Sequence, residues 1–283
     1  MPSYAIIGSS KGIGLEYVRQ LASDPKNTVF ATVRDKGTAT QLAAIAETAK
    51  NVHIIEADVV NTTSLKAAAD EVAKISGGSL DVLIHNAAKF KNETFFYTFE
   101  DYESPEALDA DFIDSFKVNV LGIIHTINAF LPLLRKGTTK KIVVIGAGGG
   151  DPDFVWKARH GYMAAIGPSQ GASAVVAAKY AVMLEDEGFT VVSLCPGIVD
   201  TINTRGHDVA ALENALAKFT ARAMKVNPGA NFAMQTPEES VRKQLKVMNA
   251  VTQNDAGGLL SHRGLDVLAG GKGGRAMDIG VYL

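Results

Sequence analysis

Short apolar runs rich in β-branched residues alternate with longer helical stretches over about the first 200 residues of the chain. The runs that predict strands are Tyr4–Ile7, Val29–Val33, Val52–Ala57, Val82–His85, Ile142–Ile145 and Thr190–Cys195. The stretches that predict helices are Gly12–Leu21, Thr38–Ala49, Thr63–Ile75, Asp109–Leu134 and Gly171–Asp186. Strands that alternate with helices form a parallel sheet covered on both faces, and such buried strands are apolar throughout. We therefore expect an α/β fold with a doubly wound parallel sheet.

No linker rich in proline or glycine divides the chain before about residue 200, so we expect one domain over residues 1–283. Two regions interrupt the alternation: residues 146–170, which have the composition of a long loop, and residues 202–235, which follow the sixth predicted strand. Ligands bind beyond the carboxyl ends of the strands in open α/β sheets, so we expect both regions to form substrate-side loops or a lid. A last helix is expected to begin at Thr236-Pro237-Glu238-Glu239, where a capping residue precedes a proline and a glutamate.

Charge and residue usage exclude several classes of function. A formal net charge of −2 without long basic runs argues against nucleic acid or an anionic membrane as a partner. The N-terminus does not have the pattern of a signal peptide, and no apolar run approaches the roughly 18 residues of a membrane span. Cys195 is the single cysteine, and the six histidines show no metal-ligand spacing. We expect a cytoplasmic protein without a metal that acts on a small molecule.

A glycine-rich turn follows the first predicted strand and opens the first predicted helix. Its sequence is Gly8-Ser9-Ser10-Lys11-Gly12-Ile13-Gly14. Glycines allow a tight turn and a close approach of the backbone, and a helix N-terminus offers amide donors to a pyrophosphate. In the first turn of a Rossmann-type sheet this pattern predicts a dinucleotide site, with contacts from Gly8, Ser10, Lys11, Gly12, Ile13 and Gly14.

The residue after the second predicted strand indicates which dinucleotide binds. Proteins that prefer NAD usually place an acid here to bind the ribose 2′-hydroxyl group. This chain has Arg34, whose guanidinium can pair with a 2′-phosphate, and Lys11 can add a second positive charge. The cofactor predicted from these residues is NADP(H).

Four further motifs follow the glycine-rich turn along the chain, three of them directly after predicted strands. Asp58-Val59 follows the third predicted strand, His85-Asn86-Ala87-Ala88 the fourth and Pro196-Gly197 the sixth, and Asn119 stands in Lys-Val-Asn-Val. With the glycine-rich turn, they make the chain resemble the short-chain dehydrogenases/reductases over essentially its whole length. The resemblance implies that Asp58 and Val59 hold adenine, that Asn86 and Ala87 line the ribose, and that Pro196, Gly197, Ile198 and Thr201 cover nicotinamide. It also implies a homodimer or homotetramer built on the helices near Asp109–Leu134 and Gly171–Asp186.

The chain departs from this family at its catalytic residues, which are a tyrosine, a lysine four residues later, a serine after the fifth strand and an asparagine. Asn119 is present, but none of the seven tyrosines is followed four residues later by a lysine. Gly146-Ala147 stands where serines are usual. Counting back from Pro196-Gly197 puts Ile166 at the tyrosine position and Gln170 at the lysine position, beside the cofactor. Ordinary ketone and alcohol chemistry is therefore expected to be lost.

Reduction of an iminium cation needs a hydride but no proton donor, so this chemistry remains open to the chain. The segment Asp151–Trp156 follows the fifth predicted strand and combines carboxylates with aromatic residues. We expect Asp153, with Asp151 as the weaker candidate, to offset the positive charge beside a wall free of water. Trp156 could stack on the substrate.

This departure resembles the fungal NADPH-dependent reductases of prenylated indole alkaloid biosynthesis. That resemblance implies iminium reduction, a guided [4+2] cycloaddition, or both, on a polycyclic nitrogen-containing substrate. Two alternatives stay open. One is a non-catalytic NADP-binding sensor or scaffold, and the other is an ordinary carbonyl reductase that uses an unusual acid such as Tyr162 or His160.

Overall fold

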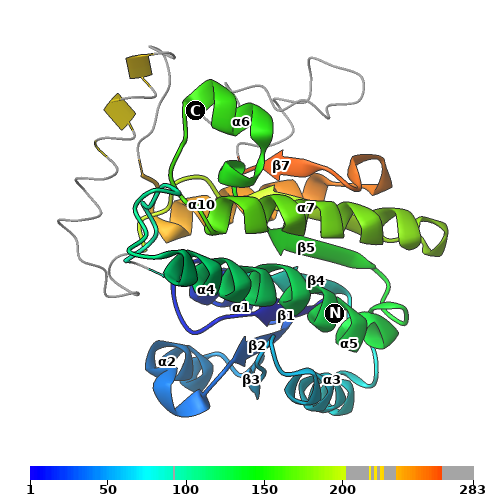
Figure 1. Ribbon diagram of the computed structural model, residues 1–283. Helices are drawn as coiled ribbons and strands as arrows, with labels where there is room; N and C mark the ends of the chain where they lie inside the picture. The colour runs from blue at the N-terminus through cyan, green and yellow to red at the C-terminus, as the bar shows by residue number, and fades with distance from the viewer. Residues whose placement is uncertain (92, 202–216, 218–219, 222–223, 226–233, 263–283) are drawn as a thin grey trace.

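Seven parallel strands form one sheet at the centre of the computed structural model (Figure 1), which describes residues 1–91, 93–201, 217, 220–221, 224–225 and 234–262. The strands are β1 (Ser3–Ile7), β2 (Thr28–Val33), β3 (Val52–Glu56), β4 (Val82–His85), β5 (Lys141–Ile145), β6 (Thr190–Cys195) and β7 (Leu259–Ser261). Their order in the sheet is β3-β2-β1-β4-β5-β6-β7. Successive strands are added on one side of β1 up to β3, and on its other side from β4 onward. This change of side between β1 and β4 is typical of a doubly wound fold. The predicted fold class is confirmed.

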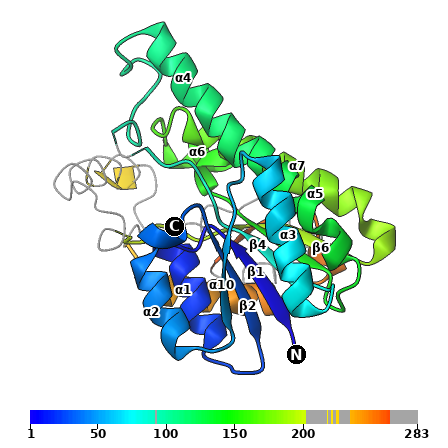
Figure 2. The ribbon, with the colours of Figure 1, turned by 90° about the horizontal axis from the view of Figure 1, so that it is seen from below.

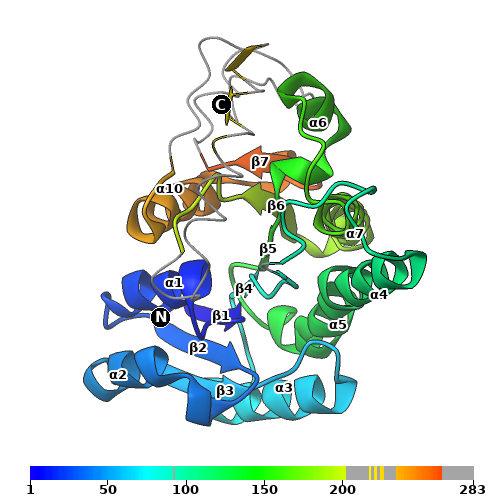
Figure 3. The same ribbon diagram turned by 60° about the vertical axis from the view of Figure 1, so that its left-hand side comes forward.

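Helices cover both faces of the sheet (Figures 2 and 3). One face carries α3 (Thr62–Ser76), α4 (Pro105–Phe116), α5 (Gly122–Leu134) and α7 (Ile166–Met183). The other carries α1 (Gly12–Ala22), α2 (Thr40–Thr48) and α10 (Pro237–Ala250). Short 3-10 turns lie at Lys36–Thr38, Gly148–Gly150, Glu185–Glu187 and Gln253–Asp255.

The two helical layers enclose separate hydrophobic cores. In β1, Ala5 and Ile7 join the core under α3, α5 and α7, whereas Ile6 joins the core under α1 and α10. Successive side chains of a strand point to opposite faces, so one apolar strand supplies both cores. The sheet is therefore held from both sides, and its carboxyl edge is fixed relative to the helices that begin there.

A π-helical turn, Lys117–Leu121, joins α4 to α5 in one continuous helical run, Pro105–Leu134. By length and composition alone, this run could cross a membrane, but its apolar window is 50% buried inside the protein. The α5 part packs on α3 and β4. This part is a core helix, with most of its residues buried.

The prediction of a loop over residues 146–170 is wrong in two places. Helix α6 (Pro152–Ala158) forms within it, because the Asp151 side chain accepts a hydrogen bond from Asp153 N and Pro152 suits a first turn. Helix α7 begins at Ile166 instead of Gly171. Its first turns contain glycine and proline, whose low helix propensity conceals the start in the sequence.

The last predicted helix is confirmed as α10, where Thr236 Oγ1 accepts a hydrogen bond from Glu239 N. Strand β7 was not predicted, because three residues carry too weak a pattern and its pairing with β6 depends on tertiary contacts. Most of the predicted substrate-side region 202–235 lies outside the described residues. The single domain over 1–283 stays a prediction for the whole chain.

Candidate cofactor and substrate site

The glycine-rich turn packs closely against the end of β4. Gly8 has a φ of +85°, and a Cβ added to it would lie 2.9 Å from Ala87 Cα. A Cβ on Gly14 would clash with Gly8 O and approach Asn86 Nδ2 to 2.6 Å. Asn86 Nδ2 donates a 2.8 Å hydrogen bond to Gly8 O. Side chains larger than hydrogen cannot fit at Gly8 or Gly14, so the backbone of the turn stays open to a ligand.

The N-terminus of α1 fits an anionic ligand. Its N-cap residue is Lys11, which makes no side-chain capping bond, and its first turn contains no acidic residue. The positive end of the helix dipole is thus not offset by a carboxylate of its own helix. Ser10 is half-buried beside Lys11, and Ile13 is buried behind the turn. The predicted pyrophosphate contacts therefore come together around one helix end.

Arg34 lies immediately beyond β2, at the same edge of the sheet as the turn. Gly8 N donates to Thr32 Oγ1 at 3.1 Å, and Ser9 N donates to Thr32 O at 2.8 Å. These bonds join the turn to the last residues of β2. Arg34 and Lys11 are both exposed, and within the described residues neither takes part in an ion pair. Two unpaired cations beside a dinucleotide turn suit a 2′-phosphate.

Asp58 and Val59 hold fixed positions after β3. Asp58 Oδ1 accepts a 3.1 Å hydrogen bond from Val60 N, and Asp58 N donates to Ser64 Oγ at 3.1 Å. Val59 is buried, and its Cγ2 would lie 2.9 Å from a Cβ added to Gly122 of α5. This packing holds both residues at the carboxyl edge, where the predicted adenine contact stays a prediction.

Asn119 is buried in the π-helical turn and connects two parts of the site. Its Oδ1 accepts a 2.7 Å hydrogen bond from Lys89 N, in the loop after β4. Its Nδ2 donates at 2.9 Å to Ser169 Oγ, which in turn donates at 2.8 Å to Ile166 O. Both ends of the Asn119 amide are engaged with the protein itself. Asn119 thus links the loop after β4 to the first turn of α7. Its predicted catalytic and cofactor-binding roles stay predictions, and π-turns of this kind are frequent at functional sites.

Ile166 and Gln170 lie one turn apart at the start of α7, and both are buried. Gln170 Oε1 is 4.0 Å from the position of a Cβ added to Gly146, and it accepts a 3.3 Å hydrogen bond from Ser173 Oγ. The structure thus brings Gln170 close to Gly146, the residue that follows β5, and the assignment of Ile166 and Gln170 to the tyrosine and lysine positions stays a prediction. These positions carry no cation and no hydroxyl group, so they supply no proton donor.

Helix α6 presents Asp153 and Trp156 to solvent. The side chain of Asp153 is 62% exposed, and Lys157 Nζ lies 3.7 Å from its Oδ2. Trp156 is 70% exposed, with the Arg159 guanidinium 4.2 Å from its ring centre. Phe154 is buried on the opposite side of the helix. The expected water-free wall around Asp153 is not formed by the described residues, because α6 packs through Phe154. The catalytic roles of Asp153 and Trp156 stay predictions.

A group of aromatic residues after β4 was missed by the sequence reasoning. The stretch from Phe90 to Tyr102 contains six aromatic residues, a density that could have revealed it. Phe90 stacks on Phe95, and Phe95 contacts Phe96 edge to face. Phe96 meets Tyr162, which lies in the segment before α7. The loop after β4 and the segment after α6 therefore share an aromatic surface.

His160 contacts this surface and was one of the alternative acids. Burial lowers the pKa of His160 to about 4, so its imidazole is neutral at pH 7. Its Nε2 lies 3.3 Å from Met163 Sδ.

Among the described residues, no group of three or more His, Cys, Asp or Glu side chains could hold a metal ion.

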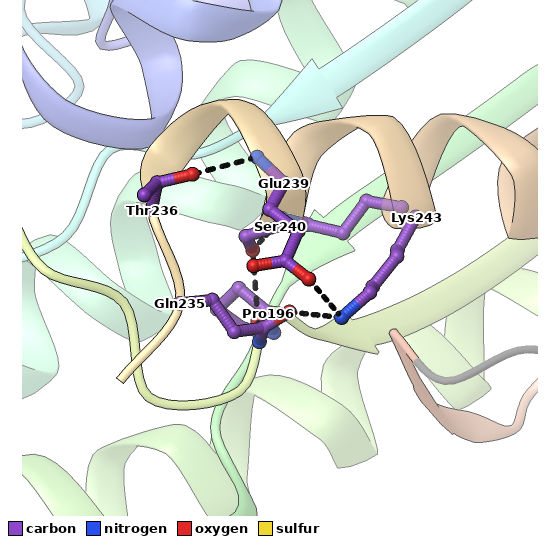
Figure 4. A network of polar contacts seen from close by, with 7 residues as sticks. Pro196, Gln235, Thr236, Glu239, Ser240 and Lys243 are labelled. Atoms are coloured by element: carbon purple, nitrogen blue, oxygen red, sulfur yellow. Dashed lines mark hydrogen bonds and ion pairs between the residues drawn. The ribbon is translucent and has the colours of Figure 1, made fainter. Parts of the chain in front are cut away.

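The turn after β6 is anchored to α10 (Figure 4). Pro196 O accepts hydrogen bonds from Ser240 Oγ at 2.8 Å and from Gln235 Nε2 at 3.2 Å. Gln235 Oε1 accepts from Lys243 Nζ at 2.9 Å, and Gln235 N donates to Ile198 O at 2.9 Å. The predicted nicotinamide-side residues before Thr201 are therefore held at the carboxyl edge of the sheet by a network of side chains.

The fold and the glycine-rich turn define a dinucleotide-binding α/β protein. The profile of the short chain dehydrogenase family matches residues 4–211. The chain therefore belongs to the short-chain dehydrogenase family. It is 39% identical over 267 residues to the short-chain dehydrogenase/reductase atnB of Arthrinium sp, an alignment that covers 93% of this chain and 98% of the relative.

A second relative is the short-chain dehydrogenase/reductase AacuF of Aspergillus aculeatus, with 37% identity over 266 residues, 93% of this chain and 98% of the relative. Among solved structures, the chain resembles a carbonyl reductase from chicken fatty liver with bound NADPH. The TM-score is 0.75 at 26% identity, and the match covers 93% of this chain and 97% of that one.

Proposed function

We propose that this protein uses NADPH to reduce an iminium, guides a [4+2] cycloaddition, or does both, on a polycyclic indole alkaloid intermediate. The observation that carries the proposal is the pair Ile166 and Gln170 at the first turn of α7. In this family that turn carries the proton donor and its cation. An otherwise preserved oxidoreductase site with neutral residues there suits a substrate that needs a hydride alone.

The two reductions differ in whether they need a proton donor, and Ile166 and Gln170 provide none. Reduction of a ketone transfers a hydride to carbon and a proton to oxygen, so it needs an acid. An iminium carbon accepts the hydride and its electron pair, the C=N π electrons move to nitrogen, and a neutral amine and NADP⁺ result. Ile166 and Gln170 can shape such a site without exchanging a proton.

The proposed cofactor is NADPH. Gly8, Gly14 and the N-terminus of α1 form a cradle for a pyrophosphate. Arg34 and Lys11 supply the charge that a 2′-phosphate needs. The similar carbonyl reductase from chicken was solved with NADPH, which supports the same choice for this chain.

The proposed counter-charge for the cationic substrate is Asp153. Its carboxylate stands at the C-terminal side of β5, one turn of α6 from Trp156. In the free protein it is exposed and paired with Lys157 at 3.7 Å. Binding of a large substrate against α6 would displace water from this carboxylate, and its effect on a cation would then increase.

We also propose a dimer or tetramer in which α4, α5 and α7 meet their counterparts. Six large apolar side chains on this helical layer are exposed in the single chain: Ile113, Phe116, Leu121, Val175, Val182 and Met183. Exposed apolar patches of this kind mark interaction surfaces. Light scattering of the purified protein measures the assembly directly.

Oxidation of NADPH tests the proposed reaction when an iminium panel is compared with ketones of the same carbon skeletons. We expect turnover of iminium substrates at least about 100-fold above that of ketones, the scale of a missing general acid. Comparable turnover of ketones would overturn the proposal. Oxidation of neither panel, with NADPH still bound, would indicate a sensor or scaffold.

Ordinary carbonyl reduction with Tyr162 as the acid is a second candidate. Tyr162 precedes Ile166 by four residues and contacts the aromatic surface, and the chicken neighbour is a carbonyl reductase. A tyrosine that acts as the acid must be essential, so Tyr162→Phe separates this candidate from the first.

A further inference from the structure

We infer that the substrate binds through a flat aromatic ring system against an aromatic wall formed by Phe90, Phe95, Phe96 and Tyr162. The inference deepens the proposed function and depends on it, because it assumes that the reaction takes place beside the first turn of α7. It names the feature of the substrate that this enzyme selects: an aromatic ring system that lies against the wall while the iminium reacts.

The aromatic wall is continuous across two segments of the chain. The ring centres of Phe90 and Phe95 are 4.6 Å apart, and those of Phe95 and Phe96 are 4.7 Å apart. Phe96 meets Tyr162 at 6.4 Å, and Tyr162 meets His160 at 6.3 Å. These separations are those of offset and edge-to-face aromatic pairs. The wall therefore extends from the loop after β4 to the segment before α7.

The segment that carries Tyr162 packs close to the first turn of α7, where the proposed reaction takes place. His160 Nε2 and Met163 Sδ lie 3.4 Å and 3.5 Å from the position of a Cβ on Gly149, just after β5. Gly149 O in turn lies 2.9 Å from the Cβ position of Gly167, the residue after Ile166. His160 and Met163, which flank Tyr162 in the sequence, are thus connected through Gly149 to the first turn of α7. Both segments also follow strands at the carboxyl edge, where ligands bind in this fold.

Buried hydrogen bonds hold the wall in place. Asp111 of α4 accepts hydrogen bonds from Thr94 Oγ1 at 2.7 Å and from Tyr102 OH at 2.8 Å. Ala164 N donates to Tyr97 O at 3.1 Å, which joins the loop to the segment that carries Tyr162. Asp111 and Thr94 are buried. The loop is therefore anchored on both sides of Phe95 and Phe96, and it is joined to the segment that carries Tyr162.

The wall keeps apolar ring surface accessible. Phe90 is 40% exposed, and Phe95, Phe96 and Tyr162 are half-buried. Aromatic faces attract other arenes beyond the area that they bury, and they also attract cations. An iminium conjugated to an arene satisfies both preferences. An aliphatic ring of the same size and charge satisfies only the second.

The test compares two iminium ions that differ only in aromaticity: 2-methyl-3,4-dihydroisoquinolinium and its counterpart with a saturated carbocycle. Binding is measured by calorimetry to the NADP⁺ complex, in which no hydride is available and neither probe is consumed. We expect the aromatic probe to bind about two- to tenfold more tightly, the range of an aromatic pair. Equal affinities would overturn the inference.

Substitutions in the wall test whether these side chains cause the preference for the aromatic probe. Phe96→Leu and Phe90→Leu should each remove most of the preference and leave NADP⁺ affinity unchanged, whereas Phe96→Tyr should retain it. Phe99→Leu is the matched control, because Phe99 lies in the same loop but is 63% exposed and contacts Phe112. An unchanged preference in both wall variants would overturn the inference, and thermal melting shows that each variant is folded. A preference in binding without NADPH oxidation by either probe would instead contradict the proposed function.

Discussion

The hydroxyl group of Tyr17 donates a 2.8 Å hydrogen bond to Oε1 of Gln244, across 227 residues of sequence. Gln244 Nε2 then donates to Ser240 Oγ at 2.9 Å, and Ser240 Oγ donates to Pro196 O at 2.8 Å. Tyr17, Gln244 and Ser240 are all fully buried. The helix that opens at the dinucleotide turn is therefore joined, through α10, to the turn after β6.

Removal of the Tyr17 hydroxyl should destabilise the fold. Tyr17→Phe leaves Gln244 Oε1 buried without its donor, and an unsatisfied buried acceptor costs about 1–3 kcal/mol. Urea denaturation should show this loss in the free energy of unfolding. Tyr180→Phe is a useful comparison, because its hydroxyl bonds to Asn128 Oδ1 in a partly buried place. A loss no larger than that of Tyr180→Phe would mean that water replaces the Tyr17 hydroxyl.

Arg34→Ala should weaken NADPH binding by about 1.5–3 kcal/mol, the contribution of a hydrogen bond to a charged group. NADH lacks the 2′-phosphate, so its affinity should change little. Calorimetric titration of both cofactors measures the difference. Native protein that binds NADPH and NADH equally well would contradict the assignment of Arg34.

A variant that carries the family's catalytic residues should gain the ability to reduce ketones. The triple variant Ala147→Ser, Ile166→Tyr, Gln170→Lys places a hydroxyl group after β5 and the tyrosine–lysine pair on α7. We expect ketone-dependent NADPH oxidation at least about 100-fold above the native level, since general acid catalysis contributes on this scale. A folded, NADPH-binding triple variant without this gain would show that the register at α7 is wrong.

Tyr162→Phe should leave turnover of the iminium substrate nearly unchanged, because the proposed reaction uses no acid. Stopped-flow measurement of NADPH oxidation under single-turnover conditions provides the rate. A fall of about 100-fold would identify Tyr162 as a general acid and favour the carbonyl reductase alternative.

Asp153→Asn should raise the barrier to hydride transfer to an iminium by about 2–4 kcal/mol, the scale of one electrostatic stabiliser, once the bound substrate has displaced water from the carboxylate. NADPH affinity should stay native. Lys157→Ala serves as the control, because it removes the ion-pair partner and leaves the carboxylate. An effect below about 1 kcal/mol, typical of an exposed pair, would leave Asp153 as a surface residue.

Stability should fall in mild acid because of His85. Burial lowers its pKa to about 4, and its Nε2 is buried without a hydrogen-bond partner. The unfolded chain binds the proton near pH 6.5 but the folded chain does not, so the contribution of His85 is complete above pH 6.5 and is lost as the pH falls toward 4. At pH 5 the loss is about 2 kcal/mol.

His85→Asn should reduce this loss in urea denaturation at pH 7 and pH 5. Burial lowers the pKa of His160 as it does that of His85. Part of the pH dependence of the free energy of unfolding should therefore remain in the variant. An unchanged pH dependence would show that His85 is already protonated or solvated in the folded protein.

Local patterns in the sequence predicted most of the fold. Strands β4 and β6 have the predicted bounds, and β1, β2, β3 and β5 differ from prediction by a single residue at one end. Buried parallel strands are mostly apolar along their length, and many helices begin at a capping residue, so both leave marks within a few residues. The glycine-rich turn was predictable for the same reason, because Gly8 and Gly14 admit no side chain.

The sequence by itself determined the order of the first six strands, the dinucleotide turn and the absence of a tyrosine–lysine pair. Only the tertiary structure decided that Phe96 meets Tyr162, 66 residues away, and that Asp153 faces solvent while Phe154 is buried. The reason is physical. Helix and strand patterns arise from neighbours within one or two turns, whereas the surroundings of a side chain depend on which distant segments fill the space beside it.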